Sequence, residues 1–213
     1  MSNSLRRRLD ATGPALATLA DRVRALVAAT IAADAPADAL ADATAAVERA
    51  LARLAPHVPS GDPERYPIPP DVRTPNDLMP FDAVMGVLNP AAPPVAMTWD
   101  GTKAIGRARF GVAHAGPPGC VHGGVLAQVF DQVLNVPNVM TGHAGPTAKL
   151  VVHFRKPTPL HADLVLEGWQ EHTEGRRVHA RGRCLHGDTV TVEAEAVFVR
   201  VPVERVMRLL DPS

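Results

Sequence analysis

Hydrophobic residues in the first 55 positions recur every three or four residues, which is the spacing of one face of an α-helix. The first stripe consists of Leu16, Leu19, Val23, Leu26, Val27 and Ile31. It breaks at Asp34 and Pro36, where proline suits the first turn of a new helix. The second stripe continues through Val47, Leu51 and Leu54. The pattern predicts an N-terminal extension of two helices over residues 1–55. Such a pair could bind a partner or a membrane surface, but packing on its own domain is the interpretation we favour.

A proline-dense stretch without period follows over residues 56–80, and it predicts a linker or an extended surface segment. Residues 81–94 are also interrupted by prolines, and we expect them to cover one edge of the next domain. That domain is predicted to span residues 81–202, with a short tail over 203–213.

From Val95 onward, polar and apolar residues alternate with the period of two that is typical of β-strands. The predicted strands are Val95–Trp99, Thr102–Val112, Thr147–Phe154, Asp163–Glu171, Arg176–His186 and Thr189–Val201. In the fifth, Arg177, His179, Arg181 and Arg183 alternate with Val178, Ala180, Gly182 and Cys184. In the sixth, Thr191, Glu193 and Glu195 alternate with Val192, Ala194 and Ala196. Short connections, including Lys156-Pro157-Thr158-Pro159, Thr173-Glu174-Gly175 and Gly187-Asp188, predict antiparallel neighbours. With one long helix ending near Met140, the expected class is α+β.

The stretch from Gly116 to Asp131 differs from the rest of the chain. It runs Gly-Pro-Pro-Gly-Cys-Val-His-Gly-Gly and then Val-Leu-Ala-Gln-Val-Phe-Asp, a tight loop followed by the start of an apolar helix. Gly123 and Gly124 allow the backbone to approach a ligand closely, because glycine has no Cβ. Unpaired N–H groups at a helix N-terminus suit a developing negative charge. An acid on an otherwise apolar helix is expected to be paired or to do chemistry. We predict an active site here; the alternatives are close helix–sheet packing at the glycines and a buried acid that caps a loop.

The spacing of Gly123 and Asp131 adds a geometric condition. On one helix they lie about 12 Å apart, so they cannot act on the same carbonyl within one chain. Two copies with antiparallel helices would bring the Asp131 of one to the Gly123 of the other, which predicts a homodimer with two sites. There the Gly123 N–H would stabilise an oxyanion. Asp131 would activate a water as general base or attack directly as a nucleophile.

Composition narrows the chemistry. No serine occurs between Gly61 and Pro212, which excludes a serine nucleophile from most of the chain. Lys plus Arg (22) balances Asp plus Glu (22), so no net charge recruits nucleic acid. The nine histidines form no zinc motif, and no nucleotide-binding glycine loop occurs, so neither a metal nor a cofactor is expected. Cys120 and Cys184 form no CxxC motif, and no apolar run is long enough to span a membrane, so we expect a cytoplasmic protein.

The Gly116–Asp131 stretch resembles the signature of the PaaI-type acyl-CoA thioesterases. The Gly-Pro-Pro-Gly ahead of His-Gly-Gly resembles the bacterial and mitochondrial long-chain acyl-CoA thioesterase branch. The segment Thr147–Leu160 is similar to the strand that follows the helix in that family. The resemblance covers about residues 80–202 and leaves the N-terminal helices without a counterpart. It implies a hot-dog fold, in which an antiparallel sheet wraps a long central helix.

The resemblance also implies a role for individual residues. His122 and Gly123 would orient and polarise a thioester carbonyl, and Asp131 of the partner subunit would act as base or nucleophile. Thr147 matches the residue that positions this acid or the lytic water. Gly124 and Gln132 are expected to contact substrate, while Arg155 and Lys156 either meet the phosphates of coenzyme A or form a solvated strand end. The sequence departs from the family at the Gly116–Gly119 loop, where many relatives carry asparagine, and at Gln132, where many carry glutamate.

The leading hypothesis is therefore an acyl-CoA thioesterase of fatty acid metabolism that works as a homodimer or possibly a tetramer. Coenzyme A is part of its substrate, so no separate cofactor is expected. Two alternatives remain open from the sequence. One is a non-catalytic acyl-CoA-binding protein with the same fold, and the other is an enoyl-CoA hydratase.

Overall fold

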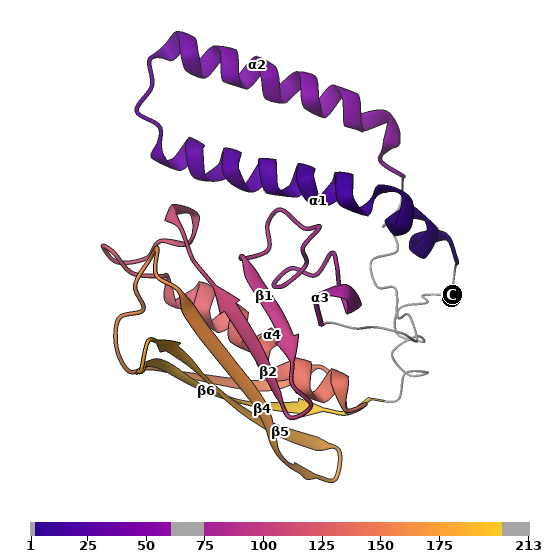
Figure 1. Cartoon of the computed structure of the whole chain (residues 1–213), viewed down its shortest axis with the longest axis vertical. Helices are drawn as coiled ribbons and strands as arrows, with labels where there is room; N and C mark the ends of the chain where they lie inside the picture. The colour runs from indigo at the N-terminus through magenta and orange to yellow at the C-terminus, as the bar shows by residue number, and fades with distance from the viewer. Residues whose placement is uncertain (1–2, 61–74, 202–213) are drawn as a thin grey trace.

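The computed structural model describes residues 3–60 and 75–201 (Figure 1). Most of the expected linker, residues 61–74, and the whole of the expected tail lie outside these ranges. Within the stretch expected to be a linker, Ala55–His57 forms a 3-10 helix and Pro75–Leu78 forms the short helix α3.

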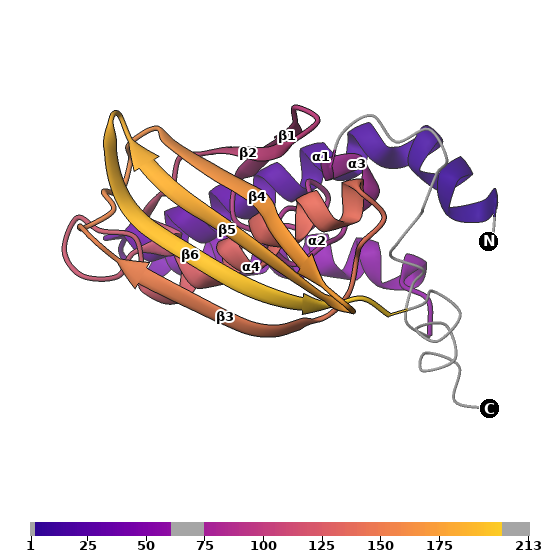
Figure 2. The ribbon, with the colours of Figure 1, turned by 90° about the horizontal axis from the view of Figure 1, so that it is seen from below.

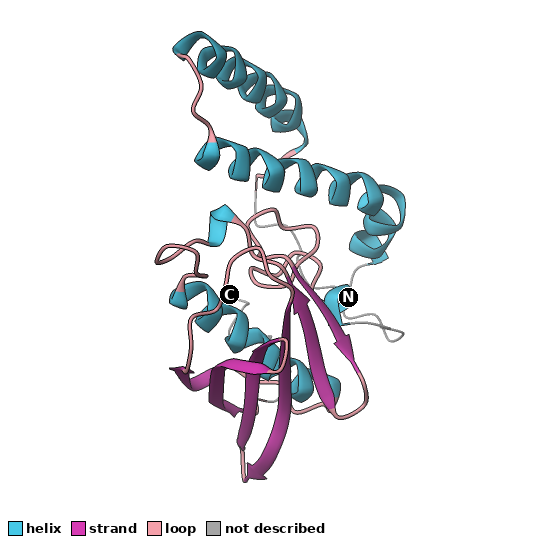
Figure 3. Cartoon of the chain, turned by 60° about the vertical axis from the view of Figure 1, so that its left-hand side comes forward, coloured by secondary structure: helices cyan, strands magenta, loops and turns pink. Residues whose placement is uncertain are grey.

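The two predicted N-terminal helices are confirmed as α1 (Asn3–Ala32) and α2 (Ala37–Leu54). They are joined by a short connection at Pro36, which precedes the first residue of α2. Figures 1 and 3 show α1 lying across the domain, with α2 alongside it on the side away from the sheet. Between residues 9 and 32 of α1, Ala20 is the buried side chain, whereas α2 has none. Packing on the domain is therefore correct for α1 and wrong for α2.

The six predicted strands form one antiparallel sheet in the order β1-β2-β4-β5-β6-β3. They are β1 (Val95–Trp99), β2 (Lys103–Ala108), β3 (Thr147–Phe154), β4 (Leu164–Glu174), β5 (Arg177–His186) and β6 (Thr189–Val199). The long helix α4 (Gly123–Met140) packs against the concave face of the sheet, and Figure 2 shows the strands curving around it. This is the α+β arrangement that the pattern predicts.

The core forms where α4 meets the sheet. The helix buries one apolar face that includes Leu126, Val129, Phe130, Val133 and Leu134. The inward rows of β4, β5 and β6 meet this face with buried apolar side chains, among them Leu166, Val178, Ala180, Cys184 and Phe198. Apolar burial of this extent is the main source of stability for a domain of this size. The helix position is therefore determined by its apolar face, and its polar face is left for other contacts.

The structure corrects three details of the predicted strands. The second strand ends at Ala108 rather than Val112, because Val112–His114 forms the 3-10 helix η2. The fourth strand extends to Glu174, with its turn at Gly175, where φ is positive. Thr191 is buried, not outward-facing, because it is the extra residue of a β-bulge: Leu185 pairs with Val190 and Cys184 with Val192.

A further correction concerns the neighbours of β3. The short connection after Phe154 predicts that β3 pairs with β4, but β3 pairs with β6 at the edge of the sheet. The connection does not turn back on itself, because it is held along the loop that precedes α4. Val121 donates a backbone hydrogen bond to the Thr158 carbonyl, and Leu160 donates one to Gly119. The chain is thereby carried from one edge of the sheet to β4 in its middle.

Candidate active site

The N-terminus of α4 is built by His122, which is the N-cap residue. Its Nδ1 atom accepts a hydrogen bond of 2.9 Å from the Gly124 N–H. A neutral imidazole that accepts at Nδ1 carries its proton on Nε2. The His122 backbone N–H in turn donates to the His114 carbonyl at 2.9 Å, which fixes the cap to η2. The exposed His122 ring is thus held in one orientation, with an N–H available at its far side.

Gly123 is the first residue of α4, and its N–H has no hydrogen-bond acceptor within the described part of the chain. The ring of Phe154, the last residue of β3, lies against it: a Cβ at position 123 would be 3.1 Å from the Phe154 Cζ atom. A free N–H at a helix N-terminus, beside an aromatic ring, can polarise a bound carbonyl. Gly123 is also closely packed, as the alternative interpretation of the glycines expects. Its neighbour Phe154 is an exposed side chain, however, and not part of the core.

Asp131 lies two turns further along α4 and is half-buried. The Thr147 hydroxyl, at the first position of β3, donates a hydrogen bond of 2.7 Å to its Oδ1 atom. This contact fits one of the two roles that the resemblance implies for Thr147, which are to position the acid or the lytic water. No backbone N–H is seen to donate to the Asp131 carboxylate within residues 3–60 and 75–201, so the alternative of a loop cap is not supported. A carboxylate with one oxygen held and a partly open surface is well placed to accept a proton from water.

The two halves of the predicted site lie on one unbroken helix. Gly123 and Asp131 both belong to α4, and eight residues of helix separate them by about 12 Å. The structure therefore brings together His122 with Gly123, and Asp131 with Thr147, but not the two pairs with each other inside one protomer.

A pocket of about 390 Å³ opens beside the N-terminus of α4. Gly123, Leu126 and Phe154 form one part of its wall, and Arg155 with Lys156 form another. The remaining lining comes from Pro117, Cys120, Val121, Pro157 and Thr158. The pocket therefore combines apolar surface, a free backbone N–H and two cations, which suits an elongated ligand with an anionic part.

Two of the predicted substrate contacts, Arg155 and Gln132, have other neighbours, whereas Lys156 is free of an ion pair among the described residues. Arg155 pairs with Glu193 through Nε and Oε2 at 2.7 Å, which offsets part of its charge. Lys156 is therefore the more available cation. Gln132 is buried, and its amide faces the sulfur of Met79 at 3.9 Å instead of the Thr147 side of the helix.

The structure adds residues that the sequence reasoning did not single out. Thr158 is 3% exposed, lines the pocket, and its hydroxyl has no partner within the described ranges. His114 supports the His122 cap, and burial lowers the pKa of its imidazole. Phe154 covers Gly123. Phe154 and Thr158 lie within the Thr147–Leu160 segment that carries the family resemblance, but their positions beside the N-terminus of α4 could be seen only in the fold.

No helix within the described residues combines the length and apolar character needed to cross a bilayer.

No protein-family model matches the chain. A crystal structure of a thioesterase superfamily protein superposes with a TM-score of 0.77 and 29% sequence identity, covering 86% of this chain and 90% of that one. The chain therefore has the hot-dog fold, as the sequence predicts. This coverage exceeds the domain of residues 81–202, so the likeness extends into the N-terminal helices, which do have a counterpart.

Curated relatives match over a shorter stretch. The acyl-coenzyme A thioesterase THEM4 of Bos taurus is 32% identical over 92 residues, which is 42% of this chain and 38% of the relative. The protein of the same name from Xenopus laevis is 32% identical over 88 residues, covering 40% of each. The match thus spans about two fifths of the length of these relatives.

Proposed function

We propose that this protein is an acyl-CoA thioesterase, which hydrolyses an acyl-CoA thioester to a carboxylic acid and coenzyme A. The observation that carries the proposal is the 2.7 Å contact between the Thr147 hydroxyl and Asp131, on a helix whose N-terminus offers the free Gly123 N–H. The likeness to a thioesterase superfamily structure and to relatives named acyl-coenzyme A thioesterase supports it. The residues around His122 favour the PaaI-type branch of these enzymes.

In the proposed reaction, the thioester carbonyl accepts a hydrogen bond from the Gly123 N–H, with the His122 Nε2–H as a second donor. Asp131 takes a proton from water, and the water oxygen adds to the carbonyl carbon. The oxyanion that forms is stabilised by these donors. When it collapses, the C–S bond breaks, and the coenzyme A sulfur leaves with the proton that Asp131 held. Direct attack by Asp131, through an anhydride that water then opens, uses the same residues.

The proposed site is completed by a second copy of the chain. Asp131 and Gly123 serve one carbonyl only when they come from different subunits, because they are about 12 Å apart on α4. The edge strand β3 supports this assembly: it pairs with β6 on one side only, and Thr147, Ala148 and Lys149 at its start are exposed. An unpaired edge next to the Asp131 contact is a suitable surface for a homodimer.

The pocket beside Gly123 is the proposed binding site for the coenzyme A part of the substrate. Lys156 and Arg155 would meet its phosphates at the rim, with Lys156 as the stronger contact because Glu193 already pairs with Arg155. Gly124 leaves the backbone next to the bound thioester carbonyl free of a side chain. Gln132 is buried against Met79 and therefore affects the substrate indirectly. Attack by water and attack by Asp131 both proceed without a metal or a separate cofactor. Two free cysteines are consistent with a cytoplasmic site of action.

The direct test measures thiol release from a panel of short-, medium- and long-chain acyl-CoAs. We expect Asp131→Asn to lower kcat at least about 100-fold without changing the thermal midpoint, since the amide keeps the shape but cannot accept a proton. The matched control is Asp188→Asn in the exposed turn between β5 and β6, which should retain full turnover. Equal turnover by Asp131→Asn would remove that residue from the mechanism. Tight acyl-CoA binding by the unmodified protein without any hydrolysis would favour a non-catalytic binding protein instead.

A further inference from the structure

We propose that the N-terminal hairpin, defined here as α1 and α2 (residues 3–54), docks on the same hairpin of a second copy of this chain. Two hairpins would form a four-helix bundle and join two of the proposed catalytic dimers into a tetramer. The inference rests on the packing and charge of the hairpin and not on the chemistry at Asp131.

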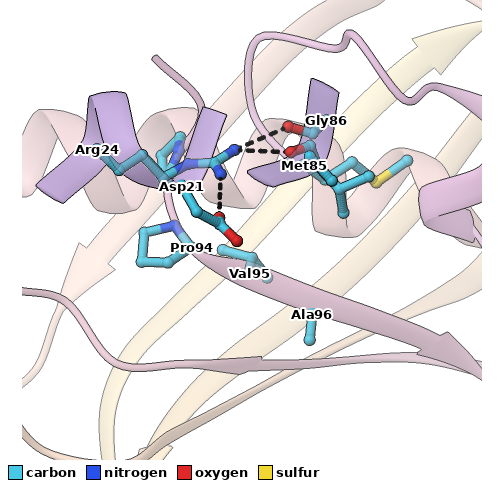
Figure 4. Close-up of a pocket in the computed structure, with 10 residues that line it drawn as sticks. Asp21, Arg24, Met85, Gly86, Pro94, Val95 and Ala96 are labelled. Carbon is cyan, nitrogen blue, oxygen red and sulfur yellow. Dashed lines mark hydrogen bonds and ion pairs between the residues drawn. The ribbon is translucent and has the colours of Figure 1, made fainter. Parts of the chain in front are cut away.

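The hairpin is anchored rigidly at α1 by Arg24 (Figure 4). Its Nη2 atom donates to the carbonyls of Asn89 at 2.7 Å, Val87 at 3.1 Å and Gly86 at 3.3 Å, and its Nη1 atom pairs with Asp21 at 2.8 Å. A guanidinium that binds three backbone carbonyls holds its helix in one orientation. The hairpin is therefore a fixed part of the molecule and not a flexible tether.

Both helices of the hairpin present large apolar side chains that the described protomer leaves about half exposed. The exposed fractions are 40% for Leu19, 41% for Leu26, 43% for Val27 and 54% for Ile31 on α1, and 50% for Leu40, 61% for Leu51 and 43% for Leu54 on α2. These residues account for most of the large hydrophobic side chains that the described chain exposes. Although α1 and α2 run side by side, they do not bury each other's apolar stripes.

The second helix depends on an external partner more than the first. Leu40, Val47, Leu51 and Leu54 share one face of α2, while Asp38, Asp42 and Arg49 fall on the opposite face. No residue of α2 is buried. An isolated helix of 18 residues is only marginally stable in water, and most helical stability in proteins comes from packing an apolar face. An amphipathic helix held out from the domain in this way fits a role in association.

The charge of α2 favours a second copy over a membrane surface. Helices that bind anionic lipid are rich in Lys and Arg on their polar face. α2 carries Asp38, Asp42 and Glu48 against only Arg49 and Arg53. A contact between two identical faces needs only self-complementarity, and an apolar face without charge meets that condition. Such a contact follows the geometry of four-helix bundles.

The two helices of the hairpin are not packed closely on each other. Among the described helices and strands, α1 makes its main contacts with η2, and α2 makes its own with η1. The helices of a second hairpin would supply the helical neighbours that each of them lacks.

The hairpin contact is separate from the interface proposed for catalysis. Ala17, Asp21 and Arg24 of α1 line a pocket with Val95 and Ala96 at the start of β1 (Figure 4). β1 and β3 are the two opposite edges of the sheet. A catalytic dimer formed along β3 and α4 therefore leaves its hairpins free to pair with another dimer.

The experiment compares the full chain with a Leu40→Glu/Leu51→Glu variant by sedimentation velocity and light scattering. We expect the mass of the particle to fall by a factor of two in the variant, while turnover per chain stays within about twofold, since α2 lies outside the proposed site. The matched control is Ala52→Glu, which places the same side chain on the charged face of α2 and should keep the wild-type mass.

A second measurement needs no variant. Hydrogen exchange of the α2 amides in the unmodified protein should quicken on dilution, because dissociation exposes a helix that is marginal alone. The proposal would be overturned by a wild-type mass no larger than that of the double variant, or by hydrogen exchange that does not depend on protein concentration. It would also be overturned if the wild type and Ala52→Glu floated with vesicles of phosphatidylglycerol and phosphatidylcholine while the double variant did not. An inactive Asp131→Asn protein, or a wholly inactive wild type, affects none of these readouts.

Discussion

His114 shows how one side chain outside the reacting groups supports the site. Its carbonyl accepts a hydrogen bond from the His122 N–H, and its ring packs edge-on against Phe110 with centroids 5.4 Å apart. Its Nδ1 atom is buried and has no hydrogen-bond partner among residues 3–60 and 75–201. Burial lowers the pKa of His114 below its ordinary value of 6.5, an effect partly offset by the Gly111 carbonyl, which favours the protonated form of the ring. The cap of α4 thus rests on a histidine that is held neutral.

We expect this histidine to make stability depend on pH. The unfolded chain binds the proton at His114 more readily than the folded one. The contribution of His114 to the free energy of unfolding is therefore fully present above pH 6.5 and is lost as the pH falls through its lower folded-state pKa. Denaturant titrations at pH 7, 6 and 5 should show a smaller decrease for His114→Gln than for the wild type. The control is His186→Gln at the exposed end of β5. If His114→Gln and the wild type lose stability in parallel, His114 does not contribute.

At the scale of elements, the position of α4 is determined by two glycines. Gly168 on β4 and Gly182 on β5 are directly paired in the register, and both face the helix. A Cβ on Gly168 would lie 2.5 Å from the Val133 carbonyl oxygen, and one on Gly182 would contact Leu134 at 2.8 Å. These positions let α4 approach the sheet closely, and this approach sets where Asp131 meets Thr147.

Substitution of Gly168 by alanine should therefore destabilise the fold by about 3 kcal/mol, because the added methyl group meets backbone that cannot move aside without shifting α4. Chemical denaturation measures the change. The same substitution at Gly13 in α1, where no atom lies within 4 Å of the added group, should leave stability unchanged or raise it slightly. A loss below about 1 kcal/mol for Gly168→Ala would mean that the helix and sheet are less tightly packed than described.

At the scale of the whole molecule, the proposed active site can be tested by mixing two defects. Asp131→Asn removes the base from one half of the site. Gly123→Val blocks the N–H in the other half, since its side chain would be driven into Phe154. Each variant alone should be inactive. A heterodimer of the two, isolated through two affinity tags, contains one intact site and should recover about half the wild-type turnover per dimer.

Homodimers of each variant, purified in the same way, serve as controls for that experiment. Recovery in the heterodimer is expected only if Gly123 and Asp131 act from different subunits. A heterodimer as inactive as its parents would show that both residues serve one carbonyl within one chain, or that one of them is not used.

The sequence alone determined the elements and much of the candidate site. Periodicity is a local property, so it was enough to predict α1, α2, α4 and the six strands. The fourth strand nevertheless extends to the turn at Gly175, and a bulge changes the direction in which Thr191 faces. The contact between Thr147 and Asp131 could also be anticipated, because the Gly116–Asp131 stretch and the Thr147 strand carry a family resemblance.

Only the tertiary structure decided how distant segments meet. The pairing of β3 with β6, the Phe154 ring over Gly123 and the His114 carbonyl at His122 are contacts that no periodicity along the chain specifies. The same holds for the hairpin: its amphipathic pattern predicts two helices, but only the fold shows that Arg24 anchors α1 while α2 stays uncovered. Spacing along the chain determines which face a residue occupies, whereas packing in three dimensions determines what that face meets.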